Sequence, residues 1–220
     1  MTLFVALAFA LILAVPGPAP AQPKDVVIGV IYPMSGPAAQ AGIDNKPVFE
    51  IAAEIANGTT DLPFPFYQRL KGMPGLKGAR VRLIFADHQG KPDVGQAEVE
   101  RMFTQEKVHA VVCCWHSNVT AAASQAAERM GRPFFNAESS SPGLTARGFQ
   151  WFFRSSPHDG HFTQVMFDFF RDFQAKRGVK LKTLGLTYED TTFGADSGKV
   201  EKELAAKYGY EVVLDLQYRA

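Results

Sequence analysis

The chain has 220 residues, of which 46% are hydrophobic and 20% are charged, and its formal net charge is +1. This length suits one large domain or a little more, and the composition is typical of a soluble globular protein. Because there is no long basic or acidic block, no nucleic acid partner is indicated, since such partners usually require a concentrated basic face.

The first 21 residues differ from the rest of the chain. The uncharged stretch MTLFVALAFALILAV is followed by PGPAPAQ, in which Ala19 and Ala21 form an A-x-A arrangement. This pattern predicts a secretory signal peptide over residues 1–21 that is cleaved after Ala21, although its start lacks the usual Lys or Arg. An uncleaved anchor is the alternative, but the apolar run is shorter than the ~20 residues that a membrane span needs. We therefore expect a soluble mature protein.

The elements that follow alternate between apolar strand-like runs and segments with helical periodicity. Strands are predicted at residues 26–31, 81–87, 110–115, 133–137, 151–156, 183–189 and 211–218. Helices are predicted between them, with these apolar stripes: Val48, Ile51, Ala52, Ile55, Ala56; Val99, Met102, Phe103; Val119, Ala122, Ala123, Ala126, Met130; and Phe162, Val165, Met166, Phe169, Phe173. A polar helix ending at Gly209 precedes the last strand.

Polar residues mark the expected helix ends. Asp93, Ser117 and Asp159 are predicted to cap helix N-termini, and Gly178 is predicted to end a helix. The adjacent cysteines, Cys113 and Cys114, are expected to be buried thiols, because neighbouring cysteines rarely form a disulfide and two cysteines give no zinc-site spacing.

This alternation predicts an α/β fold, with a parallel sheet covered by helices on both faces. In such sheets, ligands bind outside the carboxyl ends of the strands. The polar residues expected to matter most therefore lie at Pro33–Gly36, Asp87–Gln89, Trp115–Asn118, Glu138–Ser141 and Glu189–Phe193. The last strand directly precedes Ala220, with no helix to cover it, so we expect a fragment of a longer protein.

Two of these loops suggest a ligand site. Ser117 precedes an alanine-rich helix, whose N-terminus offers free N–H groups and suits a carboxylate. The loop after the next strand offers Glu138, Ser139, Ser140 and Ser141 on the same side of the sheet. A plain helix cap and a plain serine-rich turn remain the alternatives.

An enzyme is the less favoured interpretation. His116 and Ser117 are neighbours whose side chains should point apart, and no G-x-S-x-G motif is present. The cluster of His158, Asp159 and His161 lacks recognised zinc spacing. No nucleotide-binding glycine motif occurs either, so we predict no catalytic residue, no metal and no cofactor.

Four segments in order, IGVIYPMSGPAAQAG, ADHQGKPDVGQAEVERM, VVCCWHSNVTAAASQAAERMGRPFFNAESSSPGLTARGFQWFFRSSP and YEDTTFGADSGK, resemble one family. They are similar to the substrate-binding proteins of ABC importers of the branched-chain amino acid (leucine/isoleucine/valine-binding) type. The resemblance implies a two-lobed periplasmic binding protein type I fold, each lobe a parallel sheet flanked by helices. Lobe one would span residues 22–155 without its returning segment, and residues 156–220 would begin an incomplete lobe two.

The resemblance also implies residue roles. Ser117 would bind the ligand carboxylate, Ser139 and Ser140 would contact the amino acid backbone, and Phe193 would lie over the ligand. Trp115 and His116 are expected to shape the rest of the pocket. Two positions depart from the pattern: Ala41 stands where one well-known family member has a large aromatic residue over the side-chain pocket, and Glu138 replaces a glycine beside the carboxylate site. The ligand is therefore expected to be larger than leucine, or not a simple aliphatic amino acid.

The expected function is that of a periplasmic solute receptor for an ABC importer. It would bind an amino acid of the branched-chain type, or a related small carboxylate or amide, by hinge closure and then dock on the membrane permease. The alternative is a ligand-sensing ectodomain with the same fold, which would respond to an amino acid, an amide or urea.

Overall fold

The structure is a computed structural model that describes residues 25–59 and 73–219. The predicted signal peptide lies outside these described residues. Within them, no helix combines the length and the apolar character that crossing a membrane requires.

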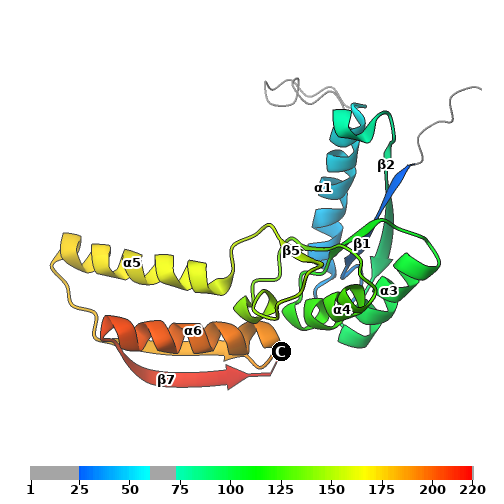
Figure 1. The fold of residues 1–220 in the computed structure, drawn as a ribbon. Helices are drawn as coiled ribbons and strands as arrows, with labels where there is room; N and C mark the ends of the chain where they lie inside the picture. The colour runs from blue at the N-terminus through cyan, green and yellow to red at the C-terminus, as the bar shows by residue number, and fades with distance from the viewer. Residues whose placement is uncertain (1–24, 60–72, 220) are drawn as a thin grey trace, which may run out of the picture.

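Strands and helices alternate along the described chain (Figure 1). The strands are β1 (Val26–Tyr32), β2 (Val81–Asp87), β3 (Ala110–Cys113), β4 (Phe134–Asn136), β5 (Phe152–Arg154), β6 (Thr183–Glu189) and β7 (Glu211–Tyr218). The helices are α1 (Ala39–Asn57), α3 (Pro92–Thr104), α4 (Ser117–Arg129), α5 (Asp159–Arg177) and α6 (Thr192–Tyr208), with short 3-10 turns η1 (Pro74–Leu76) and η2 (Pro142–Leu144).

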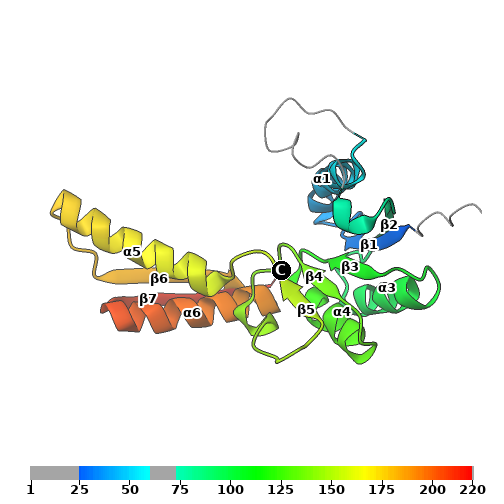
Figure 2. The ribbon, with the colours of Figure 1, turned by 45° about the horizontal axis from the view of Figure 1, so that its top comes forward.

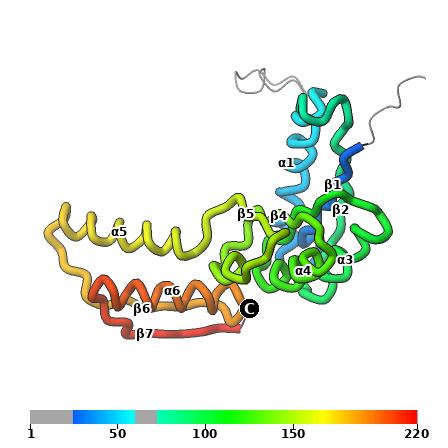
Figure 3. The backbone as a smooth tube through the Cα atoms, in the orientation of Figure 1, coloured from blue at the N-terminus to red at the C-terminus, as the bar shows by residue number. Residues whose placement is uncertain are grey.

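The strands form two parallel sheets. Five of them pair in the order β2-β1-β3-β4-β5, and β6 pairs with β7 in a second sheet. Figures 1 and 2 show α1 on one face of the five-stranded sheet and α3 and α4 on the other. The chain leaves this sheet after β5 and enters the second body through α5 (Figure 3). The predicted α/β class with parallel sheets flanked by helices is therefore confirmed.

The main core lies between the five-stranded sheet and the pair α3 and α4. It buries the predicted apolar faces of both helices, including Met102 and Val119, against strand residues such as Val111 and Phe134. The two helices approach closely at Gly95, where an added Cβ would lie 2.4 Å from Cγ1 of Val119. This packing holds the N-terminus of α4 at the carboxyl end of β3.

The second body has a smaller core, and there the predicted face of α5 is wrong. Phe162, Val165 and Phe169 are 54%, 68% and 61% exposed, whereas Phe167 is completely buried. Helix α5 carries apolar residues around much of its circumference, and the side that includes Phe167 packs against α6, β6 and β7. Periodicity alone does not show which of two apolar sides is covered.

The helix N-termini also differ from the predictions by one or two residues. The N-cap residues are Lys91, His116 and His158 in place of Asp93, Ser117 and Asp159. Each predicted cap already lies in the first helical turn, where its acidic or hydroxyl group still faces the positive end of the helix. The C-terminal predictions are confirmed, because Gly178 and Gly209 adopt left-handed φ angles of 66° and 77°.

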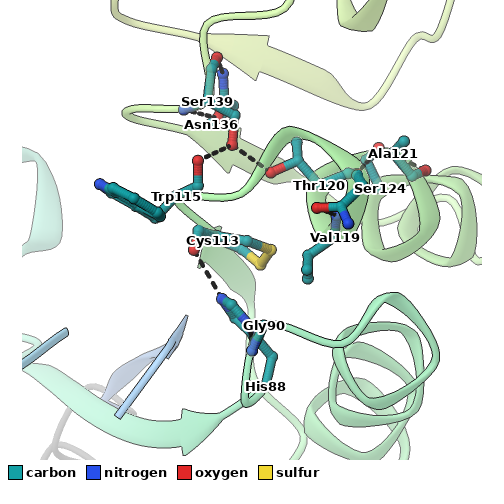
Figure 4. Close-up of a disulfide and its surroundings, with 12 residues drawn as sticks. His88, Gly90, Cys113, Trp115, Val119, Thr120, Ala121, Ser124, Asn136 and Ser139 are labelled. Atoms are coloured by element: carbon teal, nitrogen blue, oxygen red, sulfur yellow. Dashed lines mark hydrogen bonds between the residues drawn. A yellow bond between two sulfur atoms is a disulfide. The ribbon is translucent and has the colours of Figure 1, made fainter. Parts of the chain in front are cut away.

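The adjacent cysteines form a disulfide, which corrects the prediction of two buried thiols (Figure 4). Both residues are completely buried, as predicted. The peptide bond between them is cis, and their Cα atoms lie 3.1 Å apart. The disulfide stands at the end of β3, directly before the loop that leads into α4.

Candidate functional site

A cavity of about 510 Å³ opens at the carboxyl ends of the strands. Loops after β1, β2, β3 and β4 form one side of it, and the loop after β6 forms the other. Its lining residues are Ser35, Pro37, Ala38, Gln89, Gly90, Trp115, His116, Ser117, Asn118, Glu138, Ser140, Glu189, Thr191 and Phe193. Its size is within the usual range for small-molecule sites.

Six of the seven predicted site residues line this cavity: Trp115, His116, Ser117, Glu138, Ser140 and Phe193. Ser139 does not, because it is 1% exposed and its hydroxyl is occupied within the protein. That hydroxyl donates to the carbonyl of Trp115 at 3.0 Å and lies 2.6 Å from the hydroxyl of Thr120 (Figure 4). Ser139 thus joins the loops after β3 and β4.

Sequence reasoning left several lining residues out of the predicted site. Ser35, Gln89, Asn118, Glu189 and Thr191 lie in the strand-end segments that the sequence had marked as important, so that signal could have found them. Pro37, Ala38 and Gly90 gave no chemical signal. They line the cavity because the backbone turns there, and Gly90 has a φ of 73°.

The N-terminus of α4 presents hydrogen-bond donors at the cavity. The first turn of a helix has N–H groups without helical partners. The amide of Thr120 is bonded to the carbonyl of His116, and the amide of Val119 to the side chain of Asn118. Among the described residues, no hydrogen bond occupies the amides of Ser117 and Asn118, so these are the first-turn donors that remain for an anion. The hydroxyl of Ser117 accepts from the amide of Ser141 at 3.3 Å and can still donate to a ligand.

The N-terminus of α6 contributes Thr191 and Phe193 to the same cavity from the second body. Figure 1 shows this end of α6 next to the first body. Thr191 is its N-cap residue, and Phe193 follows in the first turn. Gly194 follows Phe193 in this turn. No larger residue fits there without a shift of the backbone, since an added Cβ would lie 2.1 Å from the carbonyl oxygen of Glu189. The hydroxyl of Ser141 donates to the carboxylate of Asp196 and so joins α6 to the loop after β4.

Asp87 shapes the wall formed by the loops after β1 and β2. Its carboxylate accepts from the amides of Met34 and Gln89, both at 2.8 Å, and from the hydroxyl of Ser35. Burial favours its protonated form, but the hydrogen bonds outweigh burial and lower the pKa of this carboxyl. Asp87 is therefore an ionised anchor that positions Ser35 and Gln89.

Two histidines support the loop after β3. His88 is completely buried, accepts from the amide of Gly90 at 3.0 Å and donates to the carbonyl of Cys114 at 2.8 Å. The ring of His116 lies 5.4 Å from that of His88 and 4.7 Å from that of Trp115. Burial, and then the proximity of His88, lower the pKa of His116 to about 4, so its imidazole is neutral near pH 7.

Glu138 is the half-buried carboxylate of the first wall. It accepts a long hydrogen bond, 3.5 Å, from the amide of Asn45 on α1. Burial raises its pKa, and the hydrogen bonds of Asn45 and Tyr32 only partly offset that effect. Its immediate partners in the described chain carry no positive charge.

The arrangement gives no geometric support to the catalytic or metal alternatives. Within the described residues, no three histidine, cysteine, aspartate or glutamate side chains converge as a metal site. Nδ1 of His158 instead accepts from the amide of Gly160 at 3.1 Å and caps α5, with His161 as its partner. The hydroxyl of Ser117 accepts a hydrogen bond from the Ser141 amide. Among the described residues, no hydrogen bond joins this hydroxyl to His116.

Comparison with known proteins identifies relatives of the whole described chain. The sequence model of a family described as "Periplasmic binding protein" matches residues 25–220. The Leu/Ile/Val-binding protein homolog 7 of Brucella suis is 30% identical over 97% of this chain and 50% of its own length. The chain therefore spans about half the length of the curated relatives it matches.

Solved structures share the fold. The branched-chain amino acid substrate-binding protein LivJ of Streptococcus pneumoniae, in complex with isoleucine, has a TM-score of 0.69 at 21% identity, over 90% of this chain and 50% of LivJ. A solute-binding protein from Rhodopseudomonas palustris, in complex with 3,4-dihydroxybenzoic acid, has a TM-score of 0.68 at 20% identity, over 89% of this chain and 47% of its own.

Proposed function

The chain belongs to the periplasmic binding protein family, and from that premise we propose that it is a solute receptor for an ABC importer. It binds a small carboxylate, an amino acid or a related molecule, in the cavity between two lobes. It then delivers the ligand to the membrane permease. The predicted signal peptide supports a periplasmic location for the mature protein.

One observation carries this proposal: a single cavity receives the N-termini of α4 and α6 from two separate sheets. Both ends bear partial positive charge, and together with serine hydroxyls they suit a carboxylate. The ligands of the two solved relatives described above, isoleucine and 3,4-dihydroxybenzoic acid, share a carboxylate and little else.

We assign the site residues as follows. Ser117, Ser140 and the first-turn amides of α4 hold the carboxylate. Phe193 covers the ligand from the second lobe, and Trp115 and His116 form neutral walls. Ser139 supports the site through Trp115 and Thr120 without touching the ligand.

We place the boundary between the lobes at residues 155 and 156. Strand β5 of the first sheet ends at Arg154, and α5 of the second body begins at Asp159. Closure about this connection would bring Phe193 and Glu189 onto a ligand held by the first lobe. The direct contact between Ser141 and Asp196 is one that such a closure would make or adjust.

A thermal-shift screen of the full-length protein tests the proposal. A ligand that binds only the native state must raise the melting temperature. The panel contains amino acids and aromatic carboxylates, each paired with the compound in which a neutral carboxamide replaces the carboxylate. We expect at least one carboxylate to stabilise the protein and its amide to do so far less. If no carboxylate shifts the midpoint, the proposal fails.

Replacing Ser117 with alanine should weaken binding of that carboxylate by about 1–3 kcal/mol, since a charged group loses one hydrogen bond. Isothermal titration calorimetry measures the difference. The control is Thr104→Ala, which removes an exposed hydroxyl at the end of α3, outside the cavity and away from the connection between the lobes. Because the Ser117 hydroxyl also accepts from Ser141, the melting temperature without ligand must be compared too. Equal affinities for Ser117→Ala and the unaltered protein would place the carboxylate elsewhere.

A further inference from the structure

We propose that the ligand carries a cationic nitrogen group remote from its carboxylate, as a basic amino acid does, and that Glu138 selects it. This inference rests on the proposed function, because it takes the N-terminus of α4 as the carboxylate site. It adds the substrate class and the residue that determines it.

The charges that line the cavity support this class. Glu138 comes from the first wall and Glu189 from the second, and no lysine or arginine is among the lining residues of the described chain. His116 is neutral near pH 7. Among the described lining residues, the helix N-termini are therefore the sources of positive charge, whereas Glu138 and Glu189 contribute two carboxylates. A ligand with one anionic and one cationic end matches this distribution.

Glu138 and Ser117 face different neighbours. The carboxylate of Glu138 is directed towards α1, where Asn45 donates to it, and Ala38 lines the cavity just before that helix. Ser117 is instead joined to Ser141 in the loop before η2. Because Glu138 faces α1 and Ser117 faces the loop before η2, we place the cationic group of the ligand on its α1 side and the carboxylate on its α4 side.

Glu138 lacks a cationic partner within the described protein. Asn45 and Tyr32 are neutral, and Asn45 also donates to the carbonyl of Ala41 at 2.9 Å. An aliphatic ligand side chain would remove more water from this half-buried carboxylate without forming a hydrogen bond or an ion pair with it. An ammonium or guanidinium group would form a charge-assisted hydrogen bond with it.

Tyr32 lies beside Glu138 on the protein side. It is completely buried and does not line the cavity. Burial, and then the charge and hydrogen bond of Glu138, raise the pKa of Tyr32, so its hydroxyl stays protonated and neutral. The partners of Glu138 within the described residues are therefore neutral donors, and its negative charge is left for a cation.

Titration of the full-length protein with L-arginine, L-lysine, L-citrulline and L-leucine tests the inference. Citrulline has nearly the shape of arginine without its charge. We expect arginine or lysine to bind at least tenfold more tightly than citrulline and leucine. If citrulline or leucine binds as tightly as the better basic ligand, or if only other carboxylates bind, the inference is overturned while the proposed function stands. If no carboxylate binds at all, the proposed function itself fails.

A variant assigns the preference to Glu138. In Glu138→Gln, the affinity for the basic ligand should fall at least tenfold, whereas the affinity for citrulline or leucine stays equal or rises. The matched control, Glu54→Gln, removes an exposed carboxylate of α1 and should leave both affinities unchanged. A preference that survives in Glu138→Gln would overturn the assignment. Should that variant fold poorly, the arginine–citrulline comparison in the unaltered protein still decides the substrate class.

Discussion

Phe167→Ala should lower the free energy of unfolding by about 3–5 kcal/mol, the usual cost of removing a buried phenylalanine. Phe167 is completely buried and its ring centroid lies 5.4 Å from that of Tyr208 and 5.6 Å from that of Tyr210. The core around it is small, so few neighbours can move to fill the cavity. Chemical denaturation of the 220-residue chain, followed by circular dichroism, measures the loss.

The matched control is Phe169→Ala on the same helix. Phe169 is 61% exposed, so its removal should cost less than about 1 kcal/mol. Equal losses at the two positions would show that the outer stripe of α5 is buried after all. That result would contradict the described packing and restore the face that periodicity had predicted.

Gly194→Ala should impair both the second lobe and the site. Its Cβ would lie 2.1 Å from the carbonyl oxygen and 2.7 Å from the backbone nitrogen of Glu189, and neither atom can yield without moving β6 or α6. Overpacking of this kind costs about 1–3 kcal/mol. Since Thr191 and Phe193 move with α6, ligand affinity should also fall by about tenfold or more, equivalent to about 1.4 kcal/mol.

Thermal unfolding and calorimetric titration give the two readouts for Gly194→Ala. Gly75→Ala is the control, because its Cβ would meet no atom within 4 Å and η1 lies outside the cavity. Unaltered affinity and stability in Gly194→Ala would mean that α6 does not pack against the end of β6 as described.

Much of the fold follows from local sequence pattern. Strand-like apolar stretches predicted the β2, β6 and β7 strands at their observed bounds, and Gly178 and Gly209 predicted helix ends because they tolerate a left-handed backbone. The packed side of α5 could not be predicted in this way. Its choice depends on α6 and β7, which are distant in sequence, and α5 is apolar on more than one side.

The candidate site was predictable where chemistry and topology coincide. Ser117 and Glu138 are polar residues that directly follow buried strands, and the carboxyl ends of parallel strands share one edge of a sheet. The occupied hydroxyl of Ser139 could not be foreseen, because Ser139 lies in the loop after β4 and its partner Thr120 lies on α4. The proximity of Tyr32 to Glu138 could not be predicted either, because Tyr32 has the sequence pattern of an ordinary buried strand residue.

The most direct test of the central claim is a crystal structure of the full-length protein with the tightest carboxylate ligand from the screen. The carboxylate should lie within about 3 Å of the Ser117 hydroxyl and the Asn118 amide, at the N-terminus of α4. Phe193 should cover the ligand from the opposite lobe. A carboxylate bound elsewhere, with the N-terminus of α4 facing only the protein or solvent, would contradict the account.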